Sequence, residues 1–166
     1  DARLTKELLA NRRVGVSQGT TTGAVQTIEA INDLIMQGRP VTSERFYQLP
    51  THSPPSEVGK RYATRGPCFM FSTACAAGNY AIGYGYDMIR LNRADLVLAG
   101  ASDPFSRISF TGFNQFKAVA PEKCQPFDKN RKGMMVAEGS GALVLESLDS
   151  AIARNAPRQP NCSASA

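Results

Sequence analysis

Cys75 is the residue of this chain best placed to act as a nucleophile. It stands in Ser72–Gly78, where a short apolar run, Cys68–Phe71, gives way to alanines and a glycine. This pattern predicts a buried strand that ends at a sharp turn, followed at once by a helix. The positive end of that helix stabilises a thiolate, and the small neighbours leave room for an incoming carbonyl. The chemistry that the segment favours is acyl transfer through a thioester, as at the nucleophile elbows of other acyl-transfer enzymes.

The other cysteines and the histidine lack this support. Cys68 lies on the predicted strand and is expected in the core, whereas Cys124 and Cys162 fall in a loop and in the C-terminal tail. No CxxC pair occurs and His52 is the only histidine, so a zinc site is not expected. His52 precedes the Cys75 segment in a loop, and we assign it no catalytic role.

The elements that must position Cys75 alternate between strands and helices. Thr73–Leu91 is expected as a central, buried helix, because its alanines and glycines allow close backbone packing. Such alternation indicates an α/β layered fold. The other elements predicted in this part are strands at Arg13–Ser17 and Ala94–Gly100, a helix at Ala24–Met36, and a helix that has Ser53 as N-cap and runs to Thr64.

The C-terminal part of the chain has less regular patterns. Arg107–Ala118 is mixed in character and is expected to be mobile. Met134–Val136 and Gly141–Glu146 are predicted as a hairpin that turns at Glu138–Ser140. A helix is expected from Leu148 to Arg154, and residues 155–166, polar and broken by prolines, are predicted as a disordered or non-native tail.

Charge and hydropathy exclude some classes of protein. The net charge of +5 comes from scattered basic residues, without the long basic run or aromatic-interleaved motif of a nucleic-acid binder. A solvated surface is the simpler interpretation, and attraction of an acidic partner is the alternative. The longest apolar runs, Leu96–Ala99 and Ala142–Leu145, are too short to span a bilayer, and the first residues do not resemble a signal peptide. We therefore expect a protein without membrane contact, in the cytoplasm or in an organelle whose targeting segment has been removed.

Four blocks of the sequence resemble the elongating β-ketoacyl-[acyl carrier protein] synthases, which are condensing enzymes of the thiolase-like superfamily. In chain order these blocks are Ser72–Gly83, Ala94–Ala101, Gln125–Gly133 and Ala137–Glu146. The resemblance implies an α/β, thiolase-like layered fold in which residues 1–154 form part of the N-terminal half of a ketosynthase domain. It also implies that the chain is an internal fragment of that domain.

The resemblance implies a reaction and its partners. In this family a cysteine, here Cys75, takes an acyl group from an acyl carrier protein as a thioester, and its backbone N–H contributes to the oxyanion hole. Malonyl carrier protein then decarboxylates, and the resulting carbanion attacks the thioester. No cofactor or metal is implied. Because the family's subunits pair, we expect a homodimer or a heterodimer with another ketosynthase chain.

Five further residues receive looser assignments from the same resemblance. Phe113 and Phe116 fall where relatives line the acyl channel, although a place in the core is an equal alternative. Thr22 falls near a chain-length position at the family's subunit interface. Arg39 and Lys123 are candidates for carrier-protein docking, on position and charge alone.

Departures from the family leave other functions open. Tyr80, Gln125 and Ala137 stand where relatives often carry His, Arg and Gly, but Cys75 is kept, which argues against a subunit that only sets chain length. The family's decarboxylation needs two histidines, a lysine and a glycine-rich loop from the second half of the domain, and His52 matches none of them. The alternatives are a non-catalytic partner or scaffold subunit that binds carrier protein or another synthase chain, and a truncated gene product without activity. The sequence leaves the acyl chain length, and the choice between fatty acid and polyketide synthesis, undetermined.

Overall fold

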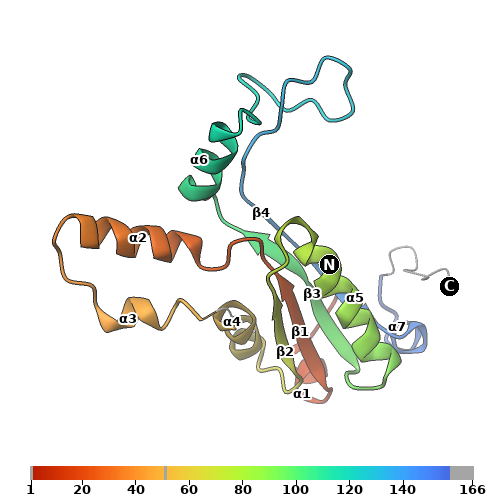
Figure 1. The fold of residues 1–166 in the computed structure, drawn as a ribbon. Helices are drawn as coiled ribbons and strands as arrows, with labels where there is room; N and C mark the ends of the chain where they lie inside the picture. Colours follow the sequence, from red (N-terminus) through yellow and green to blue (C-terminus); the bar gives the residue numbers. More distant parts are fainter. Residues whose placement is uncertain (1, 51, 158–166) are drawn as a thin grey trace.

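A four-stranded mixed sheet forms the centre of the molecule, in a computed structural model that describes residues 2–50 and 52–157. The strand order is β2–β1–β3–β4. The first three strands, β1 (Val14–Gly19), β2 (Cys68–Phe71) and β3 (Leu96–Asp103), run parallel, and β4 (Gly139–Glu146) runs antiparallel to β3. Helices follow strands in the connections between them (Figure 1), so the predicted α/β fold is confirmed.

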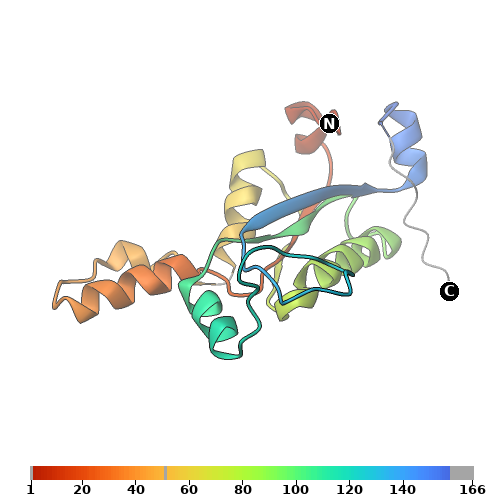
Figure 2. The ribbon, with the colours of Figure 1, turned by 90° about the horizontal axis from the view of Figure 1, so that it is seen from above.

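The helices lie on both faces of the sheet and at its side. Figure 2 shows α5 on one face, α1, α4 and α7 on the other, and α2 with α3 projecting sideways as an arm. In the described residues no helix has the length and apolar character needed to cross a bilayer. The helices are α1 (Lys6–Ala10), α2 (Val25–Met36), α3 (Ser43–Phe46), α4 (Ser53–Tyr62), the 3₁₀ turn η1 (Ala74–Ala76), α5 (Ala77–Arg90), α6 (Arg107–Gln115) and α7 (Leu148–Ala153).

The core forms on both faces of β1 and β3, because successive side chains of a strand point to opposite faces. On one face, Leu96 and Val14 pack with Leu9 of α1. On the other face, Val97 and Ala99 pack with Met88 of α5 and with its neighbours. The small residues of α5 let it approach the sheet closely. The strands and helices around β1 are therefore densely packed and hold the turns at the strand ends in place.

The helix predicted over Thr73–Leu91 is confirmed as α5, but it starts later than predicted and is only partly buried. The helix proper begins at Ala77, after η1, and its sheet-facing residues such as Ala81 and Gly85 are buried. Its outer face is open, with Tyr80 58% exposed. Close packing against the sheet accounts for the small residues on the buried face, because a Cβ on Gly85 would lie 3.2 Å from a methyl of Val97 and 3.3 Å from Ala99.

Two predictions about strands are wrong. Cys68–Phe71 is the edge strand of the sheet and Cys68 is exposed, because β1 covers only one of its sides. Met134–Val136 does not form a hairpin with Gly141–Glu146. Met134 instead makes an isolated parallel bridge to Val119, and β4 pairs along its whole length with β3.

The prediction of a mobile segment at Arg107–Ala118 is also wrong, because α6 occupies most of it. Ser106 caps this helix by accepting a hydrogen bond from the N–H of Ser109 at 3.0 Å. Ser53, predicted as the N-cap of α4, is its first residue, and His52 holds the cap position. Of the predicted C-terminal tail, residues 158–166, with Cys162, lie outside the described part of the chain.

Candidate functional site

Cys75 lies in the 3₁₀ turn between β2 and α5, so the predicted strand–turn–helix arrangement is confirmed. Ala74 adopts a left-handed backbone conformation with φ of 49°, which turns the chain sharply before Cys75. The thiol is free and the residue is exposed. The thiol is thus held at a tight turn outside the core, next to the positive end of a 14-residue helix.

The position of this turn is fixed by the end of β1. Gly19 has no side chain, and a Cβ there would lie 2.8 Å from the N of Gly78 and closer still to the carbonyl group of Ala77. The backbone of β1 therefore touches the first turn of α5 directly. Ser17, two residues earlier, donates a hydrogen bond of 2.7 Å to the carbonyl oxygen of Ala81, which holds the next turn of the helix.

An open, mainly apolar hollow of about 380 Å³ lies beside the first turns of α5. Most of its lining residues are glycine or alanine, so backbone atoms of α5, β3 and β4 come close to its surface. Gly78, which contributes to it, is three residues beyond Cys75. The remaining lining residues are Asn79, Ile82, Gly100, Ala101 and residues 141–143 of β4.

Thr22 belongs to a turn that a half-buried carboxylate holds at the same edge of the sheet. Asp103, the last residue of β3, accepts hydrogen bonds from the hydroxyl of Thr20 at 2.8 Å, and from the N–H and hydroxyl of Thr21 at 2.7 and 3.0 Å. Burial would raise the pKa of Asp103, but these hydrogen bonds outweigh it and lower the pKa below its ordinary value. The sequence analysis missed Asp103, although a polar residue at the carboxyl end of a predicted parallel strand is a usable signal.

The two phenylalanines predicted at the acyl channel both lie on or next to α6. Phe113 is half-buried, whereas Phe116 is 81% exposed, so the alternative that Phe116 is core is wrong for the described chain. Glu29 of α2, a second residue that sequence reasoning missed, anchors this helix. Its carboxylate accepts hydrogen bonds from the N–H of Ile108 at 3.1 Å and from the Nε of Arg107 at 3.1 Å.

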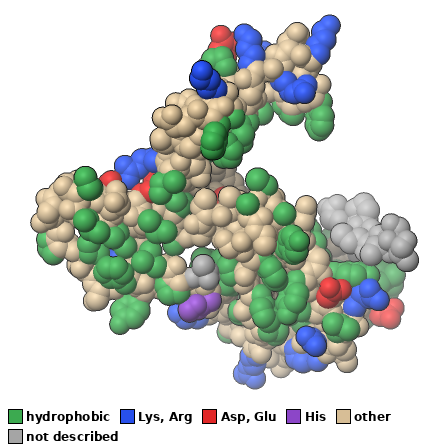
Figure 3. Space-filling view, viewed as in Figure 1, with side chains coloured by type: hydrophobic (Ala, Val, Ile, Leu, Met, Phe, Trp, Pro, Cys, Tyr) green, Lys and Arg blue, Asp and Glu red, His purple; other side chains and the backbone are tan. Residues whose placement is uncertain are grey.

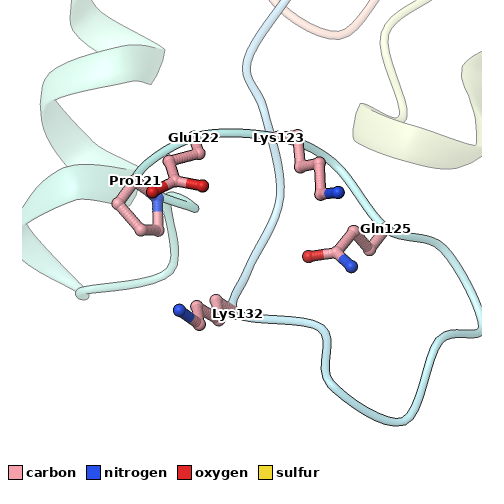
Figure 4. A pocket seen from close by; sticks show the side chains of 5 residues that line it. All are labelled: Pro121, Glu122, Lys123, Gln125 and Lys132. Carbon is pink, nitrogen blue, oxygen red and sulfur yellow. The ribbon is translucent and has the colours of Figure 1, made fainter.

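The two predicted docking residues lie on different segments. Arg39 is exposed just after α2, where it donates to the Gln37 side chain at 3.4 Å. Lys123 lines a small pocket in the loop after α6, together with Lys132 and Gln125 (Figure 4). The turn after α2 and the loop after α6 lie far apart in both ribbon views, so the structure does not bring these two cations together.

Cys68 differs from Cys75 in its surroundings. Its sulfur faces Gly59 of α4, where an added Cβ would come within 3.3 Å of it. Burial raises the pKa of the Cys68 thiol more than hydrogen bonding to Thr64 and Val16 lowers it. Near neutral pH less of the Cys68 thiol is therefore ionised than in an ordinary cysteine, which makes Cys68 a poor candidate for the nucleophile. Among the described residues no group of His, Cys, Asp and Glu side chains could hold a metal ion.

Known proteins resemble this chain in sequence. The family described as "Beta-ketoacyl synthase, N-terminal domain" matches residues 1–151. Nodulation protein E of Rhizobium leguminosarum bv. trifolii is 38% identical over 149 residues, which cover 87% of this chain and 37% of the relative. The tetracenomycin polyketide synthase ketoacyl synthase alpha subunit of Streptomyces glaucescens is 34% identical over 94% of this chain and 40% of its own length.

Two solved structures extend the likeness to the fold. The ishigamide ketosynthase/chain length factor superposes with a TM-score of 0.86 and 35% identity over 93% of this chain and 39% of that one. The structure of a type II polyketide acyl-carrier protein in complex with its ketosynthase superposes with a TM-score of 0.79 and 32% identity. The match covers 88% of this chain and 40% of that one. The layered, thiolase-like arrangement expected from the resemblance is thereby confirmed. The chain spans about two fifths of the length of these proteins.

Proposed function

Because the chain belongs to the β-ketoacyl synthase family, we propose that Cys75 is the residue that carries the growing acyl group. In the whole protein the acyl thioester on Cys75 would undergo decarboxylative Claisen condensation with a malonyl carrier protein. The observation that carries the proposal is an exposed, free thiol on the turn that joins β2 to the first turn of α5. Residues 1–154 then form part of the N-terminal half of the ketosynthase domain.

The chemistry begins with transfer of the acyl group. The Cys75 thiolate attacks the carbonyl carbon of the carrier-bound thioester, a new C–S bond forms, and the carrier's thiolate leaves and takes up a proton. The negative charge that develops on the carbonyl oxygen requires N–H donors, and the backbone N–H of Cys75 is the donor that the family resemblance assigns. The left-handed Ala74 favours this role, since it sets the direction of the peptide group that precedes Cys75.

Binding of the acyl chain and of partners involves the segments around the turn. Thr22 and Phe113 with Phe116 would contact the acyl chain. Arg39 and Lys123, both exposed, would attract the acidic surface of an acyl carrier protein, by separate contacts since the structure does not bring them together. Similar structures support these partners, since they include a ketosynthase with its acyl-carrier protein and a ketosynthase/chain length factor.

The working protein would pair with a second copy or with another ketosynthase chain, in the cytoplasm. The relatives include polyketide ketosynthases and a 3-oxoacyl-[acyl-carrier-protein] synthase, so the pathway is either polyketide or fatty acid synthesis.

Selective acylation tests this proposal. The chain is incubated with an acyl-N-acetylcysteamine thioester, and the adduct is located by mass spectrometry of peptides. We expect the acyl group on Cys75 and no adduct at position 75 in Cys75→Ala. Little adduct is expected on Cys68, because its raised pKa leaves less of its thiol ionised. Equal acylation of both cysteines, or none at Cys75, would contradict it.

A second assay on the same protein tests the other function left open by the sequence, that of a non-catalytic subunit. Malonyl carrier protein decarboxylation is followed with and without Cys75→Ala. Turnover above that control identifies a condensing enzyme. Carrier-protein binding without acylation of Cys75 identifies the non-catalytic subunit.

A further inference from the structure

The side-chain carboxylate of Asp103 binds the turn that follows β1. Its two carboxylate oxygens accept three hydrogen bonds from Thr20 and Thr21, at distances between 2.7 and 3.0 Å. The hydroxyl of Thr20 in turn accepts a hydrogen bond from the N–H of Gly23 at 3.0 Å. The turn from Thr20 to Gly23 is therefore tied to the end of β3 by a carboxylate that uses both oxygens.

This turn lies next to the Cys75 turn because of the strand order. β1 runs between β2 and β3, and all three end at the same edge of the sheet. Gly19 pairs with Phe71, and the N–H of Thr20 donates to the carbonyl oxygen of Phe71 at 2.9 Å. Phe71 is four residues before Cys75, so Thr20 is bonded directly to the strand that leads into the nucleophile.

We propose that Asp103 is a positioning residue of the acyl-binding site, which fixes the Thr20–Gly23 turn beside Cys75 and so determines which acyl chains reach the sulfur. The inference rests on the proposed function of Cys75. It adds a residue and a role: the carboxylate acts through the turn and does not touch the acyl group itself. A carboxylate is suited to this role, since it accepts from a backbone N–H and two hydroxyls at once, and such charge-assisted hydrogen bonds are stronger than neutral ones.

A purely structural role makes a different prediction. In this turn Thr21 is exposed and Thr20 is buried, whereas the core of the sheet is formed by Val14, Leu96 and Val97 on the two faces of β1 and β3. Loss of the Asp103 hydrogen bonds should free the turn and leave the sheet intact. A change in selectivity at unchanged fold is thus the signature of positioning.

The experiment measures acylation of Cys75 by a short (butanoyl) and a long (dodecanoyl) N-acetylcysteamine thioester, in the full chain. Asp103→Ala removes all acceptors, and Asp103→Asn keeps one acceptor oxygen. Asp87→Asn, an exposed carboxylate on α5, is the matched control for loss of charge. Far-UV circular dichroism and hydrogen exchange at the Thr21 N–H are recorded for each variant.

We expect the ratio of long-chain to short-chain acylation rates to change by about tenfold in Asp103→Ala, less in Asp103→Asn and not in Asp87→Asn. Exchange at Thr21 should accelerate in the same order. Equal slowing of both acyl chains, or an unchanged ratio, would overturn the inference while leaving the proposed function standing.

Absence of any adduct on Cys75 of the unchanged protein overturns both proposals. If Asp103→Ala does not fold, Thr21→Val, which loses one hydroxyl donor, is measured against Thr21→Ser, which keeps it. A ratio that shifts in the Val variant and is retained in the Ser variant supports the role of Asp103. Equal ratios in these two variants refute it.

Discussion

The replacement Gly19→Ala should move the nucleophile without touching it. The new methyl group would lie 2.8 Å from the N of Gly78 and closer to the carbonyl group of Ala77. Both are backbone atoms of the first turn of α5, so no flexible side chain can give way. The turn that carries Cys75 directly precedes this helix and must move with it.

The size of the effect follows from the contact distances. Carbon and nitrogen atoms that do not bond pack at about 3.5 Å, so α5 and β1 must separate by at least about 0.7 Å. Overpacking of this kind costs about 1–3 kcal/mol of stability. A displacement approaching 1 Å at a reacting group lowers a rate by as much as about 100-fold. We therefore expect a modest loss of stability and a much larger loss in the acylation rate of Cys75.

Two measurements check this expectation. Urea unfolding gives the free energy of unfolding, and peptide mass spectrometry gives the rate of acylation at Cys75. Gly83→Ala is the matched control, because no atom lies within 4 Å of the added methyl and alanine favours a helix by about 0.5–1 kcal/mol over glycine. The reasoning is refuted if Gly19→Ala keeps both the stability and the Cys75 acylation rate of the unchanged protein. It is also refuted if the control Gly83→Ala loses stability and acylation rate as Gly19→Ala is expected to do.

Two carboxylates give the remaining predictions. Glu146→Gln should destabilise the fold by about 3 kcal/mol in urea unfolding, because it leaves Arg154, only 11% exposed, without its ionic partner; Glu57→Gln, which breaks an exposed pair, should leave the midpoint nearly unchanged. Hydrogen bonds from Ile108 and Arg107 outweigh burial and lower the pKa of Glu29 below its ordinary 4.5, so its contribution to stability is present above that value and is lost as the pH falls through the lowered pKa. Glu29→Gln should flatten the acid limb of urea midpoints measured from neutral to acidic pH, and an acid limb as steep as in the unchanged protein would count against this linkage.

Local patterns were sufficient to predict the element that carries the candidate site. The alternating strand over Arg13–Ser17, the helix over Ala24–Met36 and the Cys75 turn are signalled within a few residues of themselves, and the structure confirms all three within two residues. The small residues of α5 predicted close packing correctly. That the opposite face of the helix is open could not be predicted, because the residue pattern of one element does not indicate how many neighbours that element has.

Pairings between distant segments could not be predicted in the same way. A turn signal beside Gly141–Glu146 favours a hairpin, but this segment pairs with β3, about forty residues earlier in the chain. The start of α6 is held by the local cap Ser106 and also by Glu29 of α2, a distant residue that no local pattern indicates. Its own sequence, with Gly112 and β-branched residues, is a weak helix signal.

The same distinction separates the nucleophile from the groups proposed to contact the acyl chain. Cys75 is positioned by backbone contacts between β1 and α5. Thr22 and Phe113, in contrast, lie on segments that are tied down by single carboxylates, Asp103 and Glu29. A few polar bonds are easier to alter than a packed core, since removing one releases a surface segment and leaves the sheet intact. Substitutions at these two carboxylates should therefore change acyl preference while Cys75 remains competent, whereas changes at Gly19 should affect all acyl chains alike.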